Sequence, residues 1–388
     1  MVKPLSNLLI AQFLSALADN AAFFAILVYL AKYSEPNPEI KMAAVQAAFL
    51  LAYVLLAPIV GTLADKNSKS NILAIGNIVK GLGIVALLAG VSPIISYGII
   101  GIGAVVYSPA KYGILTELTT NGEELLKANA KIESLTIVAI LIGTVAGGAI
   151  SEFSVYLGIS ACLVFYVLSL IMSLYIPKKA GNTGISYITS IKSFFSDLKC
   201  LVKNPKLRFS LIGTSSFWMT SAVLRIAFLA WLAIYLGIKS QAEQSVIVGV
   251  TAIGIMIGAI LTPKLINTDR FYNVYKYGFV LASVICLSYF INNLILTVGL
   301  LLTIGFLGGI FVVPLNTIIQ ENGKQLIGSG KTIAVQNFAE NCFMLIGIGL
   351  YKFAVSNEVA VNLAVVGIGF ILLVIVLYLF KASRKLNK

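Results

Sequence analysis

The sequence predicts an all-α, polytopic membrane protein with twelve transmembrane helices in two bundles of six. Of its 388 residues, 59% are hydrophobic and only 11% are charged, whereas soluble proteins have about 25% charged residues. The apolar residues gather in runs of about 20, the length at which a helix crosses a bilayer. The runs are expected to be helices, because lipid offers no hydrogen-bond partner to unpaired backbone N–H and C=O groups. The alternation of apolar and polar residues that is typical of a membrane β-barrel strand is absent.

Twelve apolar runs follow one another along the chain, and each predicts one spanning helix. The approximate ranges are 5–33, 41–63, 71–90, 94–116, 129–151, 157–177, 208–233, 245–266, 274–291, 294–318, 331–354 and 359–380.

One long polar segment, from Pro177 to Arg208, interrupts the apolar runs after the sixth. It predicts an N-terminal six-helix bundle over 1–177, a cytoplasmic linker over 178–207 and a C-terminal six-helix bundle over 208–388. Within the linker, the stretch that begins at Tyr187 has apolar residues at helical spacing with lysines between them. This pattern is typical of an amphipathic helix that lies on a membrane surface.

The 28 basic residues are distributed unevenly between the two sets of helix ends. Twenty-one lie at one set of ends, four lie at the opposite ends and three lie inside spans. The positive-inside rule places the basic ends in the cytoplasm, together with both termini. The net charge of +13 therefore follows from membrane topology, and we expect no nucleic-acid partner.

Histidine is absent from the sequence, and the four cysteines have no metal-ligand or disulfide spacing. Histidine is the commonest general base and metal ligand. We therefore expect neither an enzyme nor a metal or cofactor site.

The two predicted bundles resemble each other at an offset of about 205 residues. Pro109 near the end of the fourth span matches Pro314 near the end of the tenth, and Lys111 matches Asn316. Many transporters are built from such repeats, with the substrate site at the interface between them.

Ionisable residues inside the predicted spans mark candidate substrate contacts, because an unpaired charge in lipid costs several kcal/mol. Asp19 and Arg225 lie well inside the first and seventh spans at an offset of 206, so we expect them to face each other across a central cavity. Glu340 shares a helix face with Asn337. The predicted substrate-binding residues are Asp19, Asn20, Lys111, Arg225, Asn337 and Glu340.

Each charge predicts a role toward a polar or zwitterionic substrate. Arg225 is the expected partner of an anion or phosphate, because a guanidinium donates bidentate hydrogen bonds. Asp19 and Glu340 either receive an ammonium group or hold Arg225 between substrates. Lys80 is a weaker candidate, because a long side chain can snorkel or pair locally.

The loop between the second and third spans reads Gly61-Thr-Leu-Ala-Asp65-Lys66-Asn-Ser-Lys69. Gly61 permits close helix approach, and Asp65 can cap the positive end of a neighbouring helix. The stretch resembles the loop signature of the major facilitator superfamily. That resemblance implies a gating or conformational role for Gly61, Asp65 and Lys69 rather than a ligand-binding one.

Further segments resemble one branch of that superfamily, the bacterial lysophospholipid transporters. They are Ala11–Asn20, Tyr107–Thr120, Phe209–Thr214, Phe311–Asn316 and Ile333–Asn341. The resemblance implies a flippase that moves lysophosphatidylethanolamine and lysophosphatidylglycerol from the outer to the inner leaflet of the bacterial inner membrane by alternating access. It further implies re-acylation by an acyltransferase, which we expect to be a separate polypeptide because the chain ends eight residues after the last span. We expect the transporter, embedded in membrane lipid, to be a monomer.

Two alternative functions stay open at this point. The first is a proton-coupled exporter of drugs or small metabolites, with the same fold and with Asp19 or Glu340 as proton carrier. The second is a membrane-bound lipid-remodelling enzyme, against which the absence of histidine argues.

Overall fold

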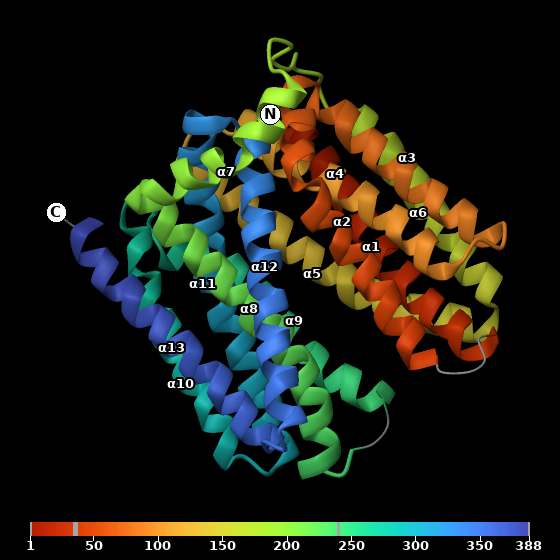
Figure 1. The fold of residues 1–388 in the computed structure, drawn as a ribbon, viewed down its shortest axis with the longest axis vertical. Helices are drawn as coiled ribbons and strands as arrows, with labels where there is room; N and C mark the ends of the chain where they lie inside the picture. The colour runs from red at the N-terminus through yellow and green to blue at the C-terminus, as the bar shows by residue number, and fades with distance from the viewer. Residues whose placement is uncertain (1, 34–37, 239–240, 387–388) are drawn as a thin grey trace. The chain divides into compact units, whose positions relative to one another are not determined.

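The computed structural model describes residues 2–33, 38–238 and 241–386. It folds them into thirteen α-helices, which are labelled in Figure 1, and two short 3-10 helices. The helices of the first half and the linker are α1 Val2–Tyr33, α2 Pro38–Lys66, α3 Lys69–Leu88, α4 Pro93–Leu118, α5 Gly122–Phe153, α6 Val155–Leu174 and α7 Tyr187–Lys203. Those of the second half are α8 Pro205–Tyr235, α9 Gln241–Leu265, η1 Thr268–Asn273, α10 Val274–Leu287, η2 Ser288–Phe290, α11 Leu294–Ile327, α12 Ser329–Ser356 and α13 Val361–Leu386.

Each predicted span corresponds to one helix, which confirms the all-α membrane fold. Eleven helices among the described residues are long and apolar enough to cross a bilayer. The one predicted span that is not among these eleven corresponds to α10, which has 14 residues and is extended at both ends by the 3-10 helices. The remaining helix, α7, coincides with the predicted amphipathic segment.

The packing of the helices repeats between the two halves. In the first half, α1 and α3 both pack on α6, and in the second half the corresponding α8 and α10 both pack on α13. Each half encloses its own apolar core. Tyr166 and Ile26 are fully buried in the first core, and Trp231 and Phe228 are fully buried in the second. The repeat inferred from sequence is thus visible in the order of helix contacts.

The chain forms two compact units by contacts between its residues. Unit 1 comprises Met1–Thr120, Val138–Leu198 and Gly323–Phe338, and unit 2 comprises Asn121–Ile137, Lys199–Asn322 and Ala339–Lys388. Each unit therefore contains the first turns of the fifth helix of the other half, α12 in unit 1 and α5 in unit 2. The division into bundles 1–177 and 208–388 with a linker at 178–207 stays a prediction.

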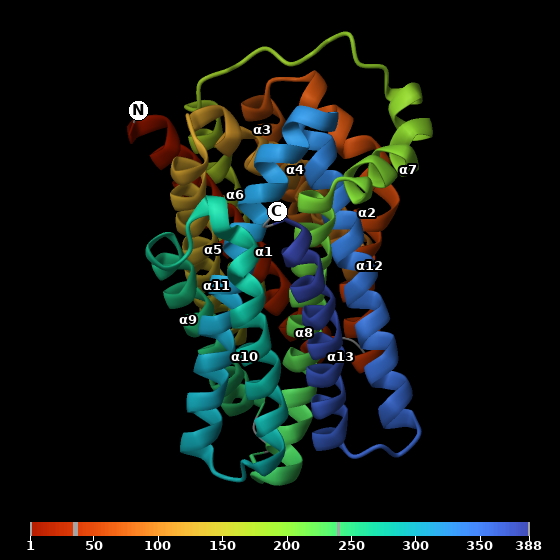
Figure 2. The ribbon, with the colours of Figure 1, turned by 90° about the vertical axis from the view of Figure 1, so that its left-hand side faces the viewer.

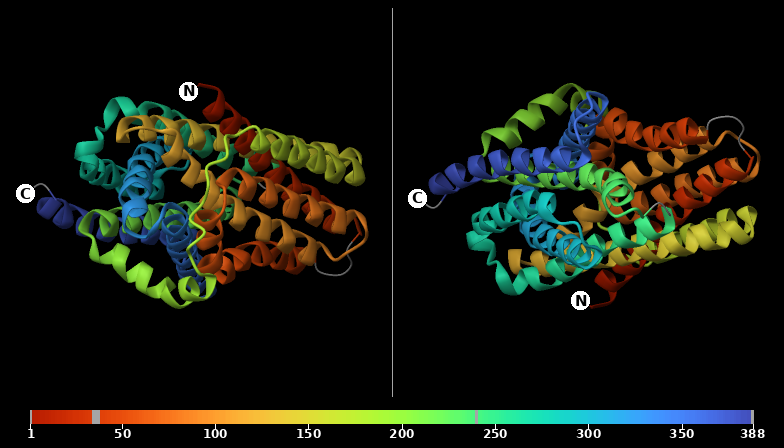
Figure 3. Two further views of the ribbon diagram at one scale, coloured as in Figure 1. Left: turned by 90° about the horizontal axis from the view of Figure 1, so that it is seen from above. Right: turned by 90° about the horizontal axis from the view of Figure 1, so that it is seen from below.

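The segment between α6 and α7 runs over helix ends of unit 1 without regular structure of its own (Figures 2 and 3). The backbone N–H of Asn182 donates to the carbonyl of Asp65 at the end of α2, and Lys179 donates to the carbonyl of Glu117 at the end of α4. These contacts bring α7 to the ends of α2 and α12, as Figure 2 shows.

Candidate functional site

A buried ion pair between α1 and α3 forms the centre of the polar interior of unit 1. The Lys80 ammonium lies 2.8 Å from Oδ2 of Asp19 and also donates to the Ser15 hydroxyl. The Tyr166 hydroxyl donates to the other Asp19 oxygen over 2.9 Å. Lys80 is only 2% exposed and Asp19 is 22% exposed. The pair therefore satisfies two charges at mid-membrane that would each be costly alone.

Hydrogen bonds extend this ion pair toward α6. The Ser15 hydroxyl donates to the side-chain oxygen of Asn77, and the Asn77 amide donates to Ser169 and Ser173. Ser169 in turn donates to the backbone carbonyl of Ala11. Buried polar groups that are hydrogen-bonded to one another fix helix rotation, because any slip leaves an unsatisfied group in a low-dielectric interior.

Two aromatic rings complete the surroundings of the Lys80 ammonium. Its Nζ lies 4.9 Å from the ring centroid of Tyr107 and 5.7 Å from that of Tyr166. A cation over an aromatic face is attracted by the ring quadrupole, and more strongly where water is absent. The lysine is therefore built into the interior and does not snorkel to a surface.

Three other predicted site residues also lie in unit 1. The Asn20 amide donates to the carbonyl of Ala16 in its own helix. The Lys111 ammonium lies 4.0 Å from the ring centroid of Tyr112. The Asn337 amide donates to the Ser108 hydroxyl over 2.9 Å, which links α12 to α4 one residue before Pro109. Their substrate-binding role stays a prediction.

The remaining predicted site residues, Arg225 on α8 and Glu340 on α12, belong to unit 2. Arg225 is exposed and Glu340 is 7% exposed. Asp19 lies in unit 1 and Arg225 in unit 2, and their approach across a central cavity stays a prediction.

Asp65 caps the N-terminus of α12, a contact we name the α2–α12 clasp. The backbone N–H of Gly330 donates to Oδ1 of Asp65 over 2.7 Å, and that of Lys331 donates to Oδ2 over 3.0 Å. The Ser329 hydroxyl also donates to Oδ1. A carboxylate at this position satisfies free N–H groups of the first turn and is attracted by the helix dipole. The capping contact expected for Asp65 is present.

Gly61 allows α2 and α12 to approach each other closely at the clasp. A Cβ atom at position 61 would lie 2.6 Å from the Lys331 Cα and 2.9 Å from the Ala334 Cβ. Backbone atoms cannot yield as a flexible side chain can, so only glycine fits without separating the helices. Lys69, the third of the predicted gating residues, forms a 2.6 Å ion pair with Glu117 at the end of α4.

A second polar contact joins the first turns of α5 to α11 in unit 2, and we name it the α5–α11 clasp. The side-chain amides of Asn129 and Gln320 donate to each other over 3.1 and 2.9 Å, and Asn129 also donates to Thr317. One turn further along α5, the Asn316 amide donates to the Glu133 carboxylate over 3.4 Å. All of these side chains are buried.

The sequence profile of the Major Facilitator Superfamily matches residues 8–348. The chain belongs to the major facilitator superfamily. It is 40% identical over 370 residues to the lysophospholipid transporter LplT of Shigella flexneri, an alignment that covers 95% of this chain and 92% of that protein. It is also 40% identical over 371 residues to a lysophospholipid transporter LplT of Escherichia coli, with the same coverage.

Solved structures of other transporters share the fold of this superfamily member. The human organic anion transporter aligns with a TM-score of 0.74 at 14% identity, over 96% of this chain and 99% of its own. The fucose:proton symporter in an outward conformation aligns with a TM-score of 0.74 at 15% identity, over 98% of this chain and 99% of its own. At such low identity the likeness concerns the fold alone.

Sequence reasoning underestimated two charged residues of this superfamily member. Lys80 was expected to be a weaker candidate for the site, because a long side chain can snorkel or pair locally. In the structure it is the buried partner of Asp19. Its place midway along the third span, at the same depth as Asp19 in the first, could have predicted the pair. Glu133 was missed, although it lies 207 residues before Glu340 and so takes the corresponding place in the first repeat.

Proposed function

We propose that this protein transports lysophospholipids between the leaflets of a bacterial inner membrane by alternating access. Its substrates are lysophosphatidylethanolamine and lysophosphatidylglycerol, which it moves from the outer to the inner leaflet. The observation that carries the proposal is the 40% identity, over 95% of the chain, with proteins named lysophospholipid transporters. Intramembrane charges of both signs are the chemistry that a glycerophosphate head group requires.

Arg225 is the proposed phosphate partner. It is exposed within a helix of 31 residues that crosses the membrane. A guanidinium that faced hydrocarbon would be costly, so its exposed surface belongs in a polar or water-filled space. Its planar fork donates paired hydrogen bonds that match phosphate oxygens.

Asp19 is the proposed acceptor for the ammonium of an ethanolamine head group, and Lys80 and Tyr166 hold it in place. A carboxylate has about four lone-pair sites, and these two partners occupy one on each oxygen. The remaining sites and the exposed 22% of the side chain are available to substrate. Glu340, Lys111, Asn337 and Asn20 supply the rest of the proposed head-group site.

The two clasps are the proposed gate at the basic ends of the helices. The α2–α12 clasp joins the second helix of one half to the fifth of the other, and the α5–α11 clasp joins the fifth helix of the first half to the second half. Opening this end requires both clasps to break. Gly61, Asp65 and Lys69 thus act on conformation and do not contact substrate.

The proposed cellular setting follows from charge distribution and substrate chemistry. Both termini face the cytoplasm, because most basic residues lie at the helix ends on their side. A flipped lysophospholipid lacks one acyl chain, so an acyltransferase on a separate polypeptide must complete it. We propose that the transporter acts as a monomer.

The test is uptake of a labelled lysophosphatidylethanolamine into spheroplasts that lack other lysolipid uptake. Wild-type protein is expected to deliver label to the inner leaflet, and Arg225→Ala is expected to abolish delivery although the protein is still inserted. Uptake that continues after addition of an uncoupler indicates movement down the lipid gradient. Indifference to lysolipid, together with proton-dependent export of another compound, would instead support the exporter.

A further inference from the structure

We infer that α7 is a lipid-binding helix whose partner is the anionic surface of the cytoplasmic leaflet. The described side chains of α7 divide into four strips along the helix, each with its own chemistry. In order around the helix they are a packing strip, an apolar strip, a lysine strip and a polar strip.

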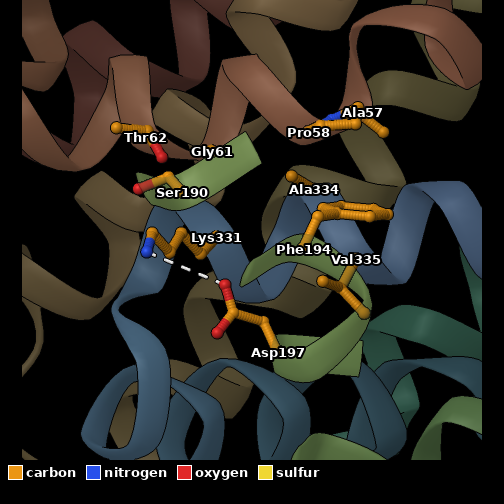
Figure 4. Close-up of a pocket in the computed structure, with 10 residues that line it drawn as sticks. All are labelled: Ala57, Pro58, Gly61, Thr62, Ser190, Phe194, Asp197, Lys331, Ala334 and Val335. Carbon is orange, nitrogen blue, oxygen red and sulfur yellow. Dashed lines mark ion pairs between the residues drawn. The ribbon is translucent and has the colours of Figure 1, made fainter. Parts of the chain in front are cut away.

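The packing strip fixes the rotation of α7 against unit 1. Phe194 is 4% exposed, and its ring meets that of Phe338 on α12 edge to face at 5.3 Å. Asp197 forms a 3.7 Å ion pair with Lys331, also on α12. Figure 4 shows this ion pair, with Phe194 beside it, around a small pocket that is also lined by Gly61 of α2. With the rotation fixed, the other strips face defined directions.

The apolar strip is exposed although its residues are large. Ile188, Ile191, Phe195 and Val202 are 68%, 45%, 67% and 40% exposed, and the spacing of three, four and seven residues puts them on one side of the helix. An interfacial helix buries such a strip in the boundary between head groups and acyl chains.

The apolar strip continues a lipid-facing surface of the neighbouring helix. On α2, Leu51, Leu55 and Ile59 repeat every four residues and are 54%, 63% and 37% exposed. This stripe lies in a helix long and apolar enough to span the bilayer. Pro58, which directly precedes Ile59, lines the same pocket as Ser190, Phe194 and Asp197 of α7. Lipid that covers α2 is therefore the occupant that also covers the apolar strip.

The lysine strip gives the head-group preference. Lys192, Lys199 and Lys203 are all exposed, and their positions on the helix lie between the apolar strip and a polar strip of Thr189, Ser196 and Cys200. Lysines at such a border extend to the head groups while their stems cover apolar surface. Each lysine near an anionic leaflet is attracted by its negative surface potential, so anionic lipid is the partner that fits.

The experiment places a spin label on either side of the border in the full-length protein. The four native cysteines, Cys162, Cys200, Cys286 and Cys342, are first replaced by serine or alanine. Into this background a single labelling site is then introduced, either by Phe195→Cys or by restoring the native Cys200. The labelled protein is placed in nanodiscs of phosphatidylcholine alone or of two parts phosphatidylcholine to one part phosphatidylglycerol. Collision with oxygen reports lipid contact, and collision with a nickel chelate reports water contact.

We expect the oxygen-to-nickel collision ratio at position 195 to exceed that at position 200 several-fold. Removing phosphatidylglycerol is expected to lower the ratio at 195 by about twofold or more, given the attraction of each lysine to anionic lipid. The triple variant Lys192→Gln, Lys199→Gln, Lys203→Gln should lose this dependence. A matched triple, Lys264→Gln, Lys276→Gln, Lys381→Gln, removes the same charge from exposed sites elsewhere and should keep it.

Two outcomes overturn the inference. Equal nickel access at positions 195 and 200 means that the apolar strip faces water. A high oxygen ratio at 195 that changes neither with phosphatidylglycerol nor with the α7 lysines means that the helix inserts by its apolar strip alone and has no anionic partner.

Discussion

The Lys80 ammonium is 2.8 Å from the Asp19 carboxylate, and the lysine is 2% exposed. Two charges of opposite sign therefore neutralise each other in the middle of the first helix bundle, where the lysine is shielded from bulk water and the aspartate is 22% exposed. Tyr166 and Ser15 hold the geometry from α6 and α1. The Asp19 carboxylate thus has its counter-charge on another helix, and the contribution of this pair to stability can be measured.

Replacing Lys80 with methionine is expected to destabilise the protein by about 3 kcal/mol, because breaking a buried pair leaves an uncompensated charge. The double variant Lys80→Met, Asp19→Asn should recover most of that loss. The measurement is thermal unfolding in detergent micelles. Lys352→Met, at an exposed position, is the matched control and should unfold as wild type does. A double variant no more stable than the single one would show that the pair is not what stabilises this interior.

The twelve spans were predictable because hydropathy and charge follow the bilayer directly. The ends of the helices were less predictable than the spans. The helix α11 was expected to stop near residue 318 but continues to Ile327, because hydropathy marks the apolar part of a helix and not its polar last turns. Asp65 was expected to cap a helix, but its partner Gly330 lies 265 residues away. The pairing of Lys80 with Asp19 depends on how each helix is rotated and packed. A helix that is apolar on all sides has no polar face in its sequence from which this rotation could be predicted.

Adding one methyl group at Gly61 is expected to block the close approach of α2 and α12. The Cβ of Gly61→Ala would lie 2.6 Å from the Lys331 Cα, so the helices must separate and the α2–α12 clasp must lengthen. We expect lysolipid uptake to fall by at least tenfold at normal membrane abundance. Gly148→Ala is the matched control, because a Cβ at that position meets no atom within 4 Å. Equal uptake by both variants would remove close helix approach from the mechanism.

Removing the Asp65 carboxylate is expected to weaken the α2–α12 clasp by about 1 kcal/mol, the usual cost of losing a helix cap. The opened fraction at this end then rises roughly fivefold. In a cysteine-free background, Thr62→Cys places a reporter at a position that is 1% exposed. Its alkylation by a membrane-impermeant maleimide in inside-out vesicles should accelerate by the same factor in Asp65→Ala.

The exposed acid Glu152 supplies the control for this measurement. Glu152→Ala removes the same charge without touching the clasp, and it should leave the alkylation rate at position 62 unchanged. Unchanged alkylation in Asp65→Ala would mean that the cap does not hold this end closed.

Asn129 and Gln320 are expected to behave as a coupled pair. Asn129→Leu leaves the Gln320 amide buried without its reciprocal partner, and an unsatisfied buried polar group costs about 1–3 kcal/mol. Replacing both residues with leucine removes both groups and should cost less than the sum of the single changes. A double-mutant cycle on thermal unfolding measures the coupling. Strict additivity would show that the two amides do not stabilise each other.

Arg225→Lys distinguishes a guanidinium that binds phosphate from a charge that only balances the bundle. A lysine keeps the charge but loses the planar fork and its paired hydrogen bonds, so we expect lysolipid uptake to fall about tenfold, the factor for one lost charge-assisted hydrogen bond of about 1.4 kcal/mol. Thermal unfolding should stay close to wild type, because the charge is retained. Wild-type uptake by Arg225→Lys would reduce Arg225 to a counter-charge, and the phosphate partner would then have to be sought at Lys111.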